Sequence, residues 1–243
     1  MDRYKNVHLW LLIPFIIVML GFAPSYWLRF TDAPFRQHLH GLTATLWFIL
    51  LIVQPYLVSR GRVRAHRRYG MFALILAGGV ALSGLGAIPY NFTNEGLPEV
   101  ARYGLSFVDI VLVAGFVASV VMAIRTVKQT EDHARWMIST VFWVLSPATF
   151  RLFMFSFIFS GVPVTDGLFV SWLAAAGLAN TAVLAALMVI DRKIHPAWLL
   201  PAICNLVMVV PMQIGQWGWW RAIADSVFTI SRLVRISLIC RLR

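Results

Sequence analysis

The sequence predicts an all-α integral membrane protein, a bundle of six to seven transmembrane helices followed by an amphipathic C-terminal helix. Of its 243 residues, 60% are hydrophobic and 13% are charged, whereas soluble domains carry about 25% charged residues. Apolar runs of about 20 residues recur, which is the length that an α-helix needs to cross the hydrocarbon core of a bilayer. No fixed-period repeat or linker separates these runs, so we expect one bundle over residues 1–220 and a basic amphipathic segment over residues 221–243.

The apolar runs define the predicted helices in chain order. They lie near residues 8–25, 38–58, 70–89, 104–124, 136–160, 168–190 and 197–215. The seventh run contains prolines and is followed by tryptophans typical of a membrane interface, so six spans and seven spans both fit. Beyond it, arginines alternate with Ile, Leu and Val, which indicates a helix lying on the membrane surface.

Basic residues predict the orientation of the bundle. They gather in the N-terminal tail and in the connections after the second, fourth and sixth runs: Arg3, Lys5, Arg60, Arg62, Arg64, Arg67, Arg68, Arg125, Lys128, Arg135, Arg192 and Lys193. Because such loops stay cytoplasmic, we expect a multi-pass protein of the cell inner membrane with a cytoplasmic N-terminus. The net charge of +11 then faces membrane lipid and does not indicate nucleic-acid binding.

Two histidines stand at predicted helix starts on the cytoplasmic side. His66 lies in RAHRRYG and His133 in EDHARWM. Two histidines from neighbouring helices can ligate a haem iron from both faces, or they can join Glu131 and Asp132 around a transition metal. A solvated basic loop at the lipid headgroups is the alternative interpretation. We therefore treat His66 and His133 as candidate cofactor-binding residues.

A second pair, His38 and His40, precedes the second apolar run on the opposite side of the membrane. A 20-residue helix, at about 1.5 Å per residue, separates it from His66 by about the membrane thickness. The two pairs therefore cannot share one ion. If the helix starts only at Leu42, both histidines can meet one metal ion; if it starts earlier, only one of them faces the bundle. No other histidine lies on this side, so Asp109 is the candidate third ligand.

Two charged residues, Asp109 and Arg151, interrupt apolar runs. Charges inside the hydrocarbon layer are expensive, and they normally face the bundle interior or a cavity. An Asp109–Arg151 ion pair would remove much of that cost. A functional cavity is the alternative. Pro147, four residues before Arg151, favours it because a proline loosens the helix and frees a backbone carbonyl.

These motifs resemble those of a known family. The stretch HLHGLTATLWFILLIVQPYLVSRGRVRAHRRYG and the later DHARWMISTVFWVLSPATFRLF are similar to an uncharacterised family of bacterial multi-pass membrane proteins with HxHG, GRxxxHRRxG and HxRWM motifs. The similarity covers residues 36–153, and it implies kinship without implying a reaction. Its recurrent positions are His38, His40, Gly41, His66, Arg67, Arg68, Gly70, His133, Arg135, Trp136, Met137 and Arg151. A weaker likeness to transmembrane b-type cytochromes implies haem b, although this chain lacks a histidine on a second helix of the outer side.

Three functions are compatible with these features. The first is a redox protein that holds haem b or a metal ion through histidines at helix ends and exchanges electrons with quinone or a partner protein. It alone explains why histidines, and not lysines, mark several helix starts. The second is an accessory or scaffold subunit of a larger membrane complex, and the third is a small proton-coupled transporter lined by Asp109 and Arg151. No nucleotide loop, nucleophile elbow or HExxH motif occurs, which leaves open whether the protein is an enzyme.

Overall fold

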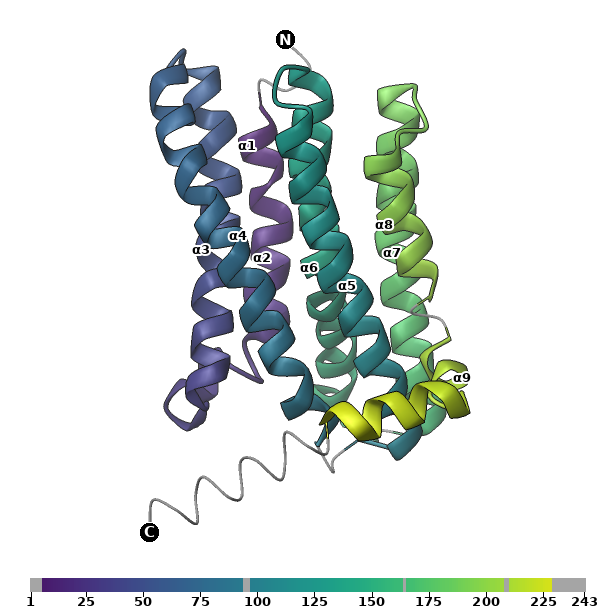
Figure 1. The fold of residues 1–243 in the computed structure, drawn as a ribbon. Helices are drawn as coiled ribbons and strands as arrows, with labels where there is room; N and C mark the ends of the chain where they lie inside the picture. The colour runs from purple at the N-terminus through teal and green to yellow at the C-terminus, as the bar shows by residue number, and fades with distance from the viewer. Residues whose placement is uncertain (1–5, 94–96, 164, 208–209, 229–243) are drawn as a thin grey trace.

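The computed structural model is a bundle of helices (Figure 1) and describes residues 6–93, 97–163, 165–207 and 210–228. No strand occurs in these ranges. The helices are α1 (Val7–Trp10), α2 (Leu12–Phe22), a 3₁₀ helix η2 (Trp27–Asp32), α3 (Phe35–Ser59), α4 (Val63–Phe92), α5 (Glu99–Arg125), α6 (Thr130–Phe159), α7 (Asp166–Asp191), α8 (Pro196–Val207) and α9 (Pro211–Ile214). A further helix covers residues 218–228.

Five helices, α3 to α7, are long and apolar enough to cross a membrane in the part of the chain that the structure describes. The first predicted span is shorter, because α1 and α2 are separate helices of 4 and 11 residues that meet at Leu11. The seventh is also shorter, since α8 has 12 residues. The all-α prediction is confirmed, and by length alone the structure supports five of the six to seven predicted spans.

Several helices begin earlier than predicted. Helix α3 starts at Phe35, directly after Pro34 in an extended conformation, so the HLHG motif is helical and a start at Leu42 is wrong. Helix α4 begins at Val63 and α6 at Thr130, so His66 and His133 lie in the first turns of helices and not in loops. In α6 the acidic residues of the first turn favour this extension, because negative charge stabilises a helix N-terminus.

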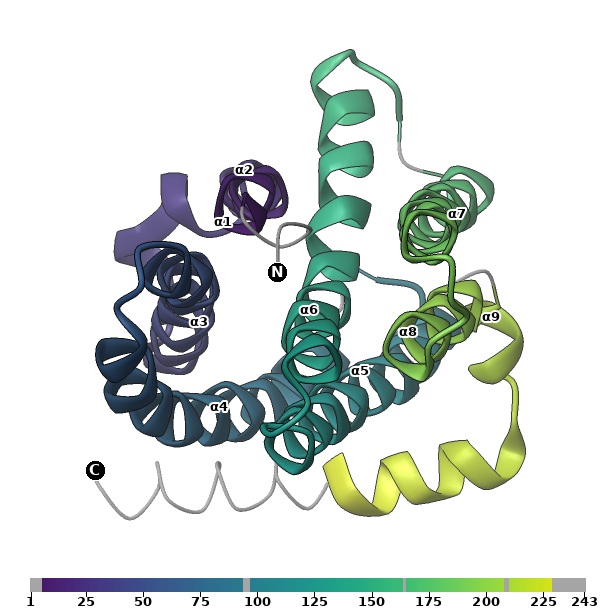
Figure 2. The ribbon, with the colours of Figure 1, turned by 90° about the horizontal axis from the view of Figure 1, so that it is seen from above.

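Helices α2 to α6 are arranged in a ring when the bundle is seen from above (Figure 2). Helix α3 packs on α4, α4 on α5, α5 on α6 and α6 on α2, while α1 packs on α3; α7 and α8 pack outside α6. Gly21 permits the α2–α6 contact, since a Cβ there would lie 2.3 Å from the carbonyl oxygen of Ala148. Small residues at helix crossings of this kind allow close approach in lipid.

A buried polar cluster joins α6, α7 and α8. Asn205 accepts hydrogen bonds from Ser146 at 2.7 Å and from Asn180 at 3.1 Å, and it donates to the carbonyl of Pro201 at 2.8 Å. All three polar side chains are buried. Because each finds partners on a neighbouring helix, the cluster links the three helices by hydrogen bonds, as polar residues do in membrane proteins.

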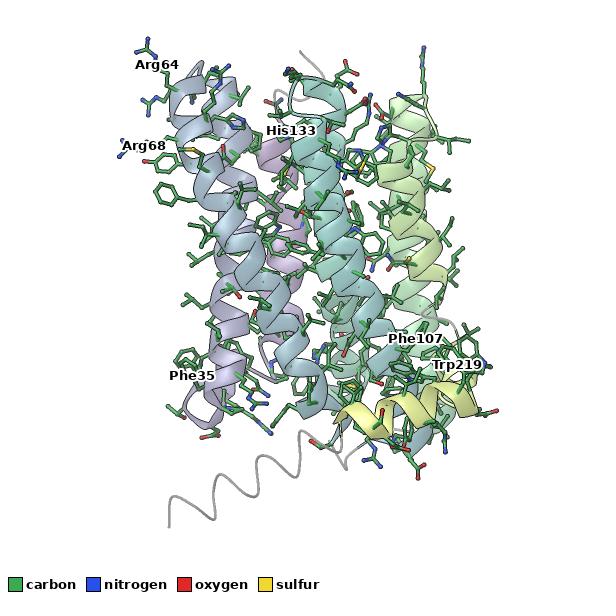
Figure 3. The ribbon with its side chains drawn as sticks, viewed as in Figure 1. Phe35, Arg64, Arg68, Phe107, His133 and Trp219 are labelled. Atoms are coloured by element: carbon green, nitrogen blue, oxygen red, sulfur yellow. The ribbon has the colours of Figure 1, made fainter. Side chains whose placement is uncertain are left out.

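The two ends of the bundle differ in composition (Figure 3). We call the end with Arg64, Arg68 and His133 the basic end, and the end with Phe35, Phe107 and Trp219 the opposite end. At the opposite end, helix 218–228 lies across the bundle (Figure 1), as expected for a helix parallel to the membrane. The Trp220 indole donates to the carbonyl of Tyr103 at 2.7 Å, which ties this helix to α5. Of the predicted segment 221–243, residues 229–243 lie outside the described ranges.

Candidate functional site

A cavity of about 250 Å³ lies inside the α2–α6 ring. Its lining is mainly apolar and aromatic, with a few polar side chains. Three of those polar residues come from different helices and were candidate site residues from the sequence: His40 from α3, Asp109 from α5 and Arg151 from α6. The structure therefore brings together residues that are up to 111 positions apart in the chain.

Arg151 lies on the α6 wall of the cavity, in the half of the helix nearer the opposite end. Its guanidinium donates to the carbonyl of Pro147, one turn earlier on the same helix, at 3.1 Å. It lies over the Phe22 ring, 4.6 Å from the centroid, as a cation–π contact. The charges of Arg151 and Asp109 interact, so both partners of the predicted pair belong to this cavity.

His40 lines the cavity from α3, and hydroxyl groups of neighbouring residues hold its imidazole. Its Nδ1 is hydrogen-bonded to the Ser83 hydroxyl of α4 at 3.1 Å, and that hydroxyl lies 3.0 Å from the Thr43 hydroxyl. Gly84, also on α4, lies beside the imidazole: a Cβ there would be 3.6 Å from the ring, an ordinary contact. The hydrogen bonds hold His40 in place while the rest of its ring borders the cavity.

The cavity has a polar level and an apolar floor. Asp109 and Phe116 are seven positions apart on α5, and Arg151 and Trp143 are eight apart on α6. At 1.5 Å per residue, Phe116 and Trp143 therefore lie roughly 10 Å deeper into the bundle than the two charges. Both are buried, and the Trp143 indole is fixed by donating to Ser119 at 2.8 Å. A ligand can place its polar atoms beside Asp109 and Arg151 and an apolar ring against Phe116 and Trp143.

His38 has a different environment from His40. Its Nδ1 is hydrogen-bonded to the Tyr26 hydroxyl at 3.1 Å, and its ring packs against Phe30 with centroids 4.4 Å apart. In the described ranges, no group of three or more His, Cys, Asp or Glu side chains is arranged to hold a metal ion. The proposed metal site of His38, His40 and Asp109 therefore has no support in this geometry.

At the basic end, His66 of α4 and His133 of α6 do meet. Their rings are edge to face with centroids 6.4 Å apart. Metal–imidazole bonds are about 2 Å long, so two rings on opposite sides of one ion have centroids roughly 6 Å apart. The structure thus brings together the two histidines that the sequence analysis paired, at a centroid separation close to this value.

Hydrogen bonds to the two rings determine which nitrogen carries the proton. His133 Nδ1 donates to the carbonyl of Ala123 at 2.8 Å, which leaves Nε2 with a lone pair, as in metal-ligating histidines. The Gln54 amide is satisfied at both ends when its nitrogen donates to His66 and its oxygen accepts from the backbone of Gly70 at 3.0 Å. In that state His66 presents an N–H at Nε2, so only His133 is prepared as a ligand, and His66 would have to exchange its proton before it could bind a metal.

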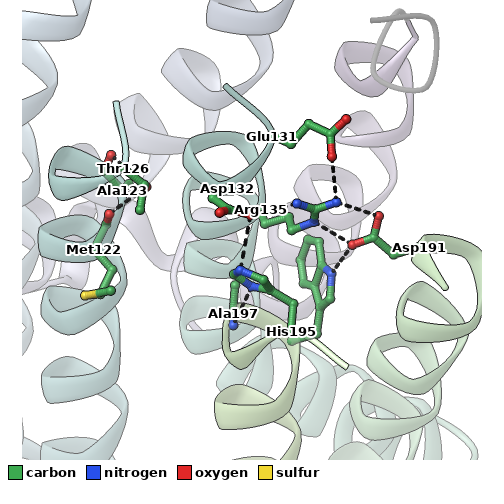
Figure 4. A network of polar contacts seen from close by, with 10 residues as sticks. Met122, Ala123, Thr126, Glu131, Asp132, Arg135, Asp191, His195 and Ala197 are labelled. Carbon is green, nitrogen blue, oxygen red and sulfur yellow. Dashed lines mark hydrogen bonds and ion pairs between the residues drawn. The ribbon is translucent and has the colours of Figure 1, made fainter. Parts of the chain in front are cut away.

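A network around Arg135 accounts for the acidic residues next to His133 (Figure 4). Arg135, 4% exposed, donates to Asp191 at 2.6 Å, to Asp132 at 2.7 Å and to Glu131 at 2.9 Å. Glu131 and Asp132, which the metal interpretation would have used as ligands, thus bind an arginine. The network joins α6 to the end of α7, and its geometry is that of a structural ion pair.

His195 extends this network to the start of α8. Its Nδ1 accepts from the backbone of Ala197 at 3.1 Å, so Nε2 carries the hydrogen and points at Asp132 across 3.4 Å. Burial lowers the pKa of His195 from its usual value of 6.5, although the negative charge of Asp132 acts in the other direction. The sequence analysis did not single out Asp191 or His195, because each stands in an ordinary basic connection between helices.

The sequence analysis also missed Tyr26, Ser83, Phe116 and Trp143, which line the cavity or hold its wall. As hydroxyl and aromatic residues in apolar runs they carry no local signal, and only their contacts identify them. Comparison of the chain with protein families, with curated proteins and with solved structures found no match.

Proposed function

We propose that this multi-pass membrane protein binds the head group of a quinone-type molecule in the cavity of the α2–α6 ring. The observation that carries the proposal is the convergence of His40, Asp109 and Arg151 above an aromatic floor in one cavity. A membrane-embedded site that combines aromatic walls with a few hydrogen-bonding groups suits a lipid-soluble ring that carries oxygen atoms.

The charges of the lining favour a ligand without net charge. Asp109 and Arg151 interact and carry opposite signs, so together they add no net charge to the cavity. An anionic or cationic ligand would enter an apolar site without a compensating charge, which is costly. A quinone is neutral, and its carbonyl oxygens accept hydrogen bonds from an arginine or a histidine.

The size of the cavity sets a further limit. At about 250 Å³ it is below the range of roughly 300–1,000 Å³ of pockets that take drug-sized ligands. It therefore suits one substituted ring, with any isoprenoid tail outside. The same lining and size also fit the transporter hypothesis, which differs in requiring release of the ligand on the other side of the membrane.

We further propose that α1–α2 and α8 cross the membrane together with α3 to α7. They run alongside the long helices (Figure 1), and both are apolar. The basic end would then face the cytoplasm of a bacterial cell, by the distribution of its arginines and lysines. Accessibility of single cysteines at the basic end and at the opposite end to a membrane-impermeant maleimide in intact cells tests this orientation.

Quinone binding is measurable through tryptophan fluorescence. The chain has ten tryptophans, of which Trp27 and Trp143 line the cavity. We expect a decyl-tailed ubiquinone analogue to quench the purified protein saturably, and Trp143→Phe to lose part of that quenching. Trp10→Phe is the matched control, because Trp10 is 68% exposed on α1 and outside the cavity lining. Linear, non-saturable quenching in the wild-type protein would refute the proposal.

Arg151 provides the chemical test of the same site. Arg151→Met keeps the length of the side chain but removes the donors, so we expect roughly tenfold weaker binding of the analogue, which corresponds to a charge-assisted hydrogen bond. Arg36→Met is the matched control, since Arg36 is exposed at the same end. Equal affinity in both variants would remove Arg151 from the site.

A second candidate function is electron transfer through a haem between His66 and His133, which the 6.4 Å ring separation favours. A bound haem would supply one-electron chemistry, and the Ala123 carbonyl would orient its His133 ligand. The absorbance spectrum of dithionite-reduced protein tests this function. A haem band that disappears in His133→Ala and persists in His8→Ala supports it, and purified protein without such a band excludes it.

A further inference from the structure

The connection between α2 and α3 contributes to the cavity lining at the opposite end. This segment, residues 23–34, contains the 3₁₀ helix η2. Ser25, Tyr26 and Trp27 belong to the cavity lining, as does Gln37 in the first turn of α3. A short 3₁₀ helix has poorer hydrogen-bond geometry than an α-helix, and Arg29 inside η2 departs from helical angles (φ −122°, ψ 32°). The segment is therefore the part of the cavity wall with the least regular backbone.

Tyr26 anchors this segment to the start of α3. Its side chain is 8% exposed, and its ring sits against Gly41, where a Cβ would come within 2.8 Å of the ring. Only glycine leaves room for the tyrosine at that place. The Tyr26 hydroxyl is hydrogen-bonded to His38 Nδ1 at 3.1 Å, and burial raises the pKa of Tyr26 above its usual value of 10.0, so the phenol stays protonated.

Aromatic contacts around Tyr26 extend the anchor. The Phe30 ring packs on His38 with centroids 4.4 Å apart, and it is stacked with Trp27 at 6.4 Å. Trp27 also packs edge to face with Tyr26 at 4.8 Å. The anchor consists of ring contacts and one hydrogen bond, which can separate and re-form at lower cost than a buried ion pair.

We propose that Tyr26 controls access to a cavity that opens beside segment 23–34: the segment covers this opening while the Tyr26 ring packs against Gly41, in what we call the Gly41 notch. The ring must leave the notch for a ligand to enter or leave. This inference rests on the proposed function of the cavity. It gives each polar or small residue of the HLHG motif a separate task, because His38 holds the tyrosine, His40 lines the site and Gly41 provides the notch.

Rates of quinone exchange test the proposal. In stopped-flow quenching with the decyl-tailed ubiquinone analogue, Tyr26→Ala removes the ring, and we expect the association and dissociation rate constants to rise together by roughly tenfold. Gly41→Ala fills the notch and expels the ring, so it raises the same two constants. Tyr26→Phe keeps the ring but loses the bond to His38, and we expect an increase of severalfold, smaller than that of Tyr26→Ala.

A double variant separates gating from a general loss of structure. If Gly41→Ala acts by displacing Tyr26, it has no further effect on the rate constants in the Tyr26→Ala background, because the two residues act on one contact. Additive effects would overturn the proposal, and so would unchanged rate constants in both single variants or a dissociation constant that rises without faster association. Absence of saturable quenching in the wild-type protein would instead refute the proposed function of the cavity itself.

Discussion

Two arginines on the same helix have different surroundings. At the basic end of α6, Arg135 is 4% exposed and is held by Glu131, Asp132 and Asp191 at 2.6–2.9 Å. Toward the opposite end, Arg151 lies over an aromatic ring, donates to a backbone carbonyl and borders a cavity. One guanidinium is enclosed by carboxylates from two helices, whereas the other faces a space that can accept a ligand.

The comparison shows that one helix places the same residue type once in a closed ion-pair network and once beside a cavity. Around Arg135 there are three carboxylates for one arginine, and the network links the end of α7 and the start of α8 to α6. Around Arg151, charge is balanced with Asp109 and the neighbouring volume is open. A buried charge beside a cavity is the usual sign of function in a membrane protein.

The largest expected effect is on stability at the basic end. Arg135→Met leaves the carboxylates of Asp132 and Asp191 without their cation, so we expect a loss of about 3–5 kcal/mol in the free energy of unfolding. Thermal unfolding in detergent measures the change. Arg125→Met is the matched control because Arg125 is exposed at the same end, and its effect should be close to zero. A similarly small loss for Arg135→Met would contradict the structural role.

The next test concerns the pair in the cavity. Asp109→Asn and Arg151→Met each leave one charge uncompensated in the apolar part of the bundle, and we expect each to cost about 2–3 kcal/mol of stability. The double variant restores charge balance, so its loss should be smaller than the sum by about 1 kcal/mol or more. Denaturation of all four proteins in the same detergent gives this coupling, and strict additivity would show that the two charges do not stabilise one another.

A smaller effect should appear as pH dependence at the basic end. Burial lowers the pKa of His195 below 6.5, so in acid the unfolded chain takes up a proton at His195 before the folded chain does. The stability associated with neutral His195 is therefore present above pH 6.5 and is lost as the pH falls through the lowered pKa. Melting temperatures between pH 8 and pH 5 should fall less steeply in His195→Asn than in the wild-type protein. Parallel curves would show that His195 does not contribute.

The smallest effect is expected at the cavity wall. Ser83→Ala removes the hydroxyl partner of His40 and should cost about 1 kcal/mol of stability, with weaker binding of the quinone analogue because His40 becomes mobile. Ser156→Ala is the matched control, since Ser156 is exposed and bonds only within α6 in the structure as described. If the two variants bind the analogue with the same affinity as the wild-type protein, His40 does not need to be held for binding.

The sequence predicted the helices well where apolar runs are long, and less well where charged residues continue a helix. The early starts of α4 and α6 escaped prediction because a basic or acidic first turn looks like a loop in a hydropathy pattern. The first and seventh segments were predicted as spans from their composition. In the described residues the first is divided at Leu11 and α8 has 12 residues, and hydropathy does not report where a helix is interrupted.

For the candidate site, composition and depth were sufficient to select Asp109 and Arg151, since the cost of a charge in hydrocarbon is a local property of the chain. The structure brings the rings of His66 and His133 together, whereas their role as cofactor ligands stays a prediction. Contact of His40 with the same cavity as Arg151 could not be predicted, because it depends on how α3 and α6 are rotated and on how closely glycines let their neighbours approach.

By itself, then, the sequence determined an all-helical protein with long apolar helices, charged ends and two unusual charges within them, because these follow from hydropathy and helix length. Only the tertiary structure decided that Arg135 is hydrogen-bonded to three carboxylates while Arg151 borders a cavity. It also decided that His38 holds a tyrosine while His40, two positions later, lines the site. The physical reason is that the surroundings of a side chain are set by helix rotation and packing between distant segments, which no local pattern encodes.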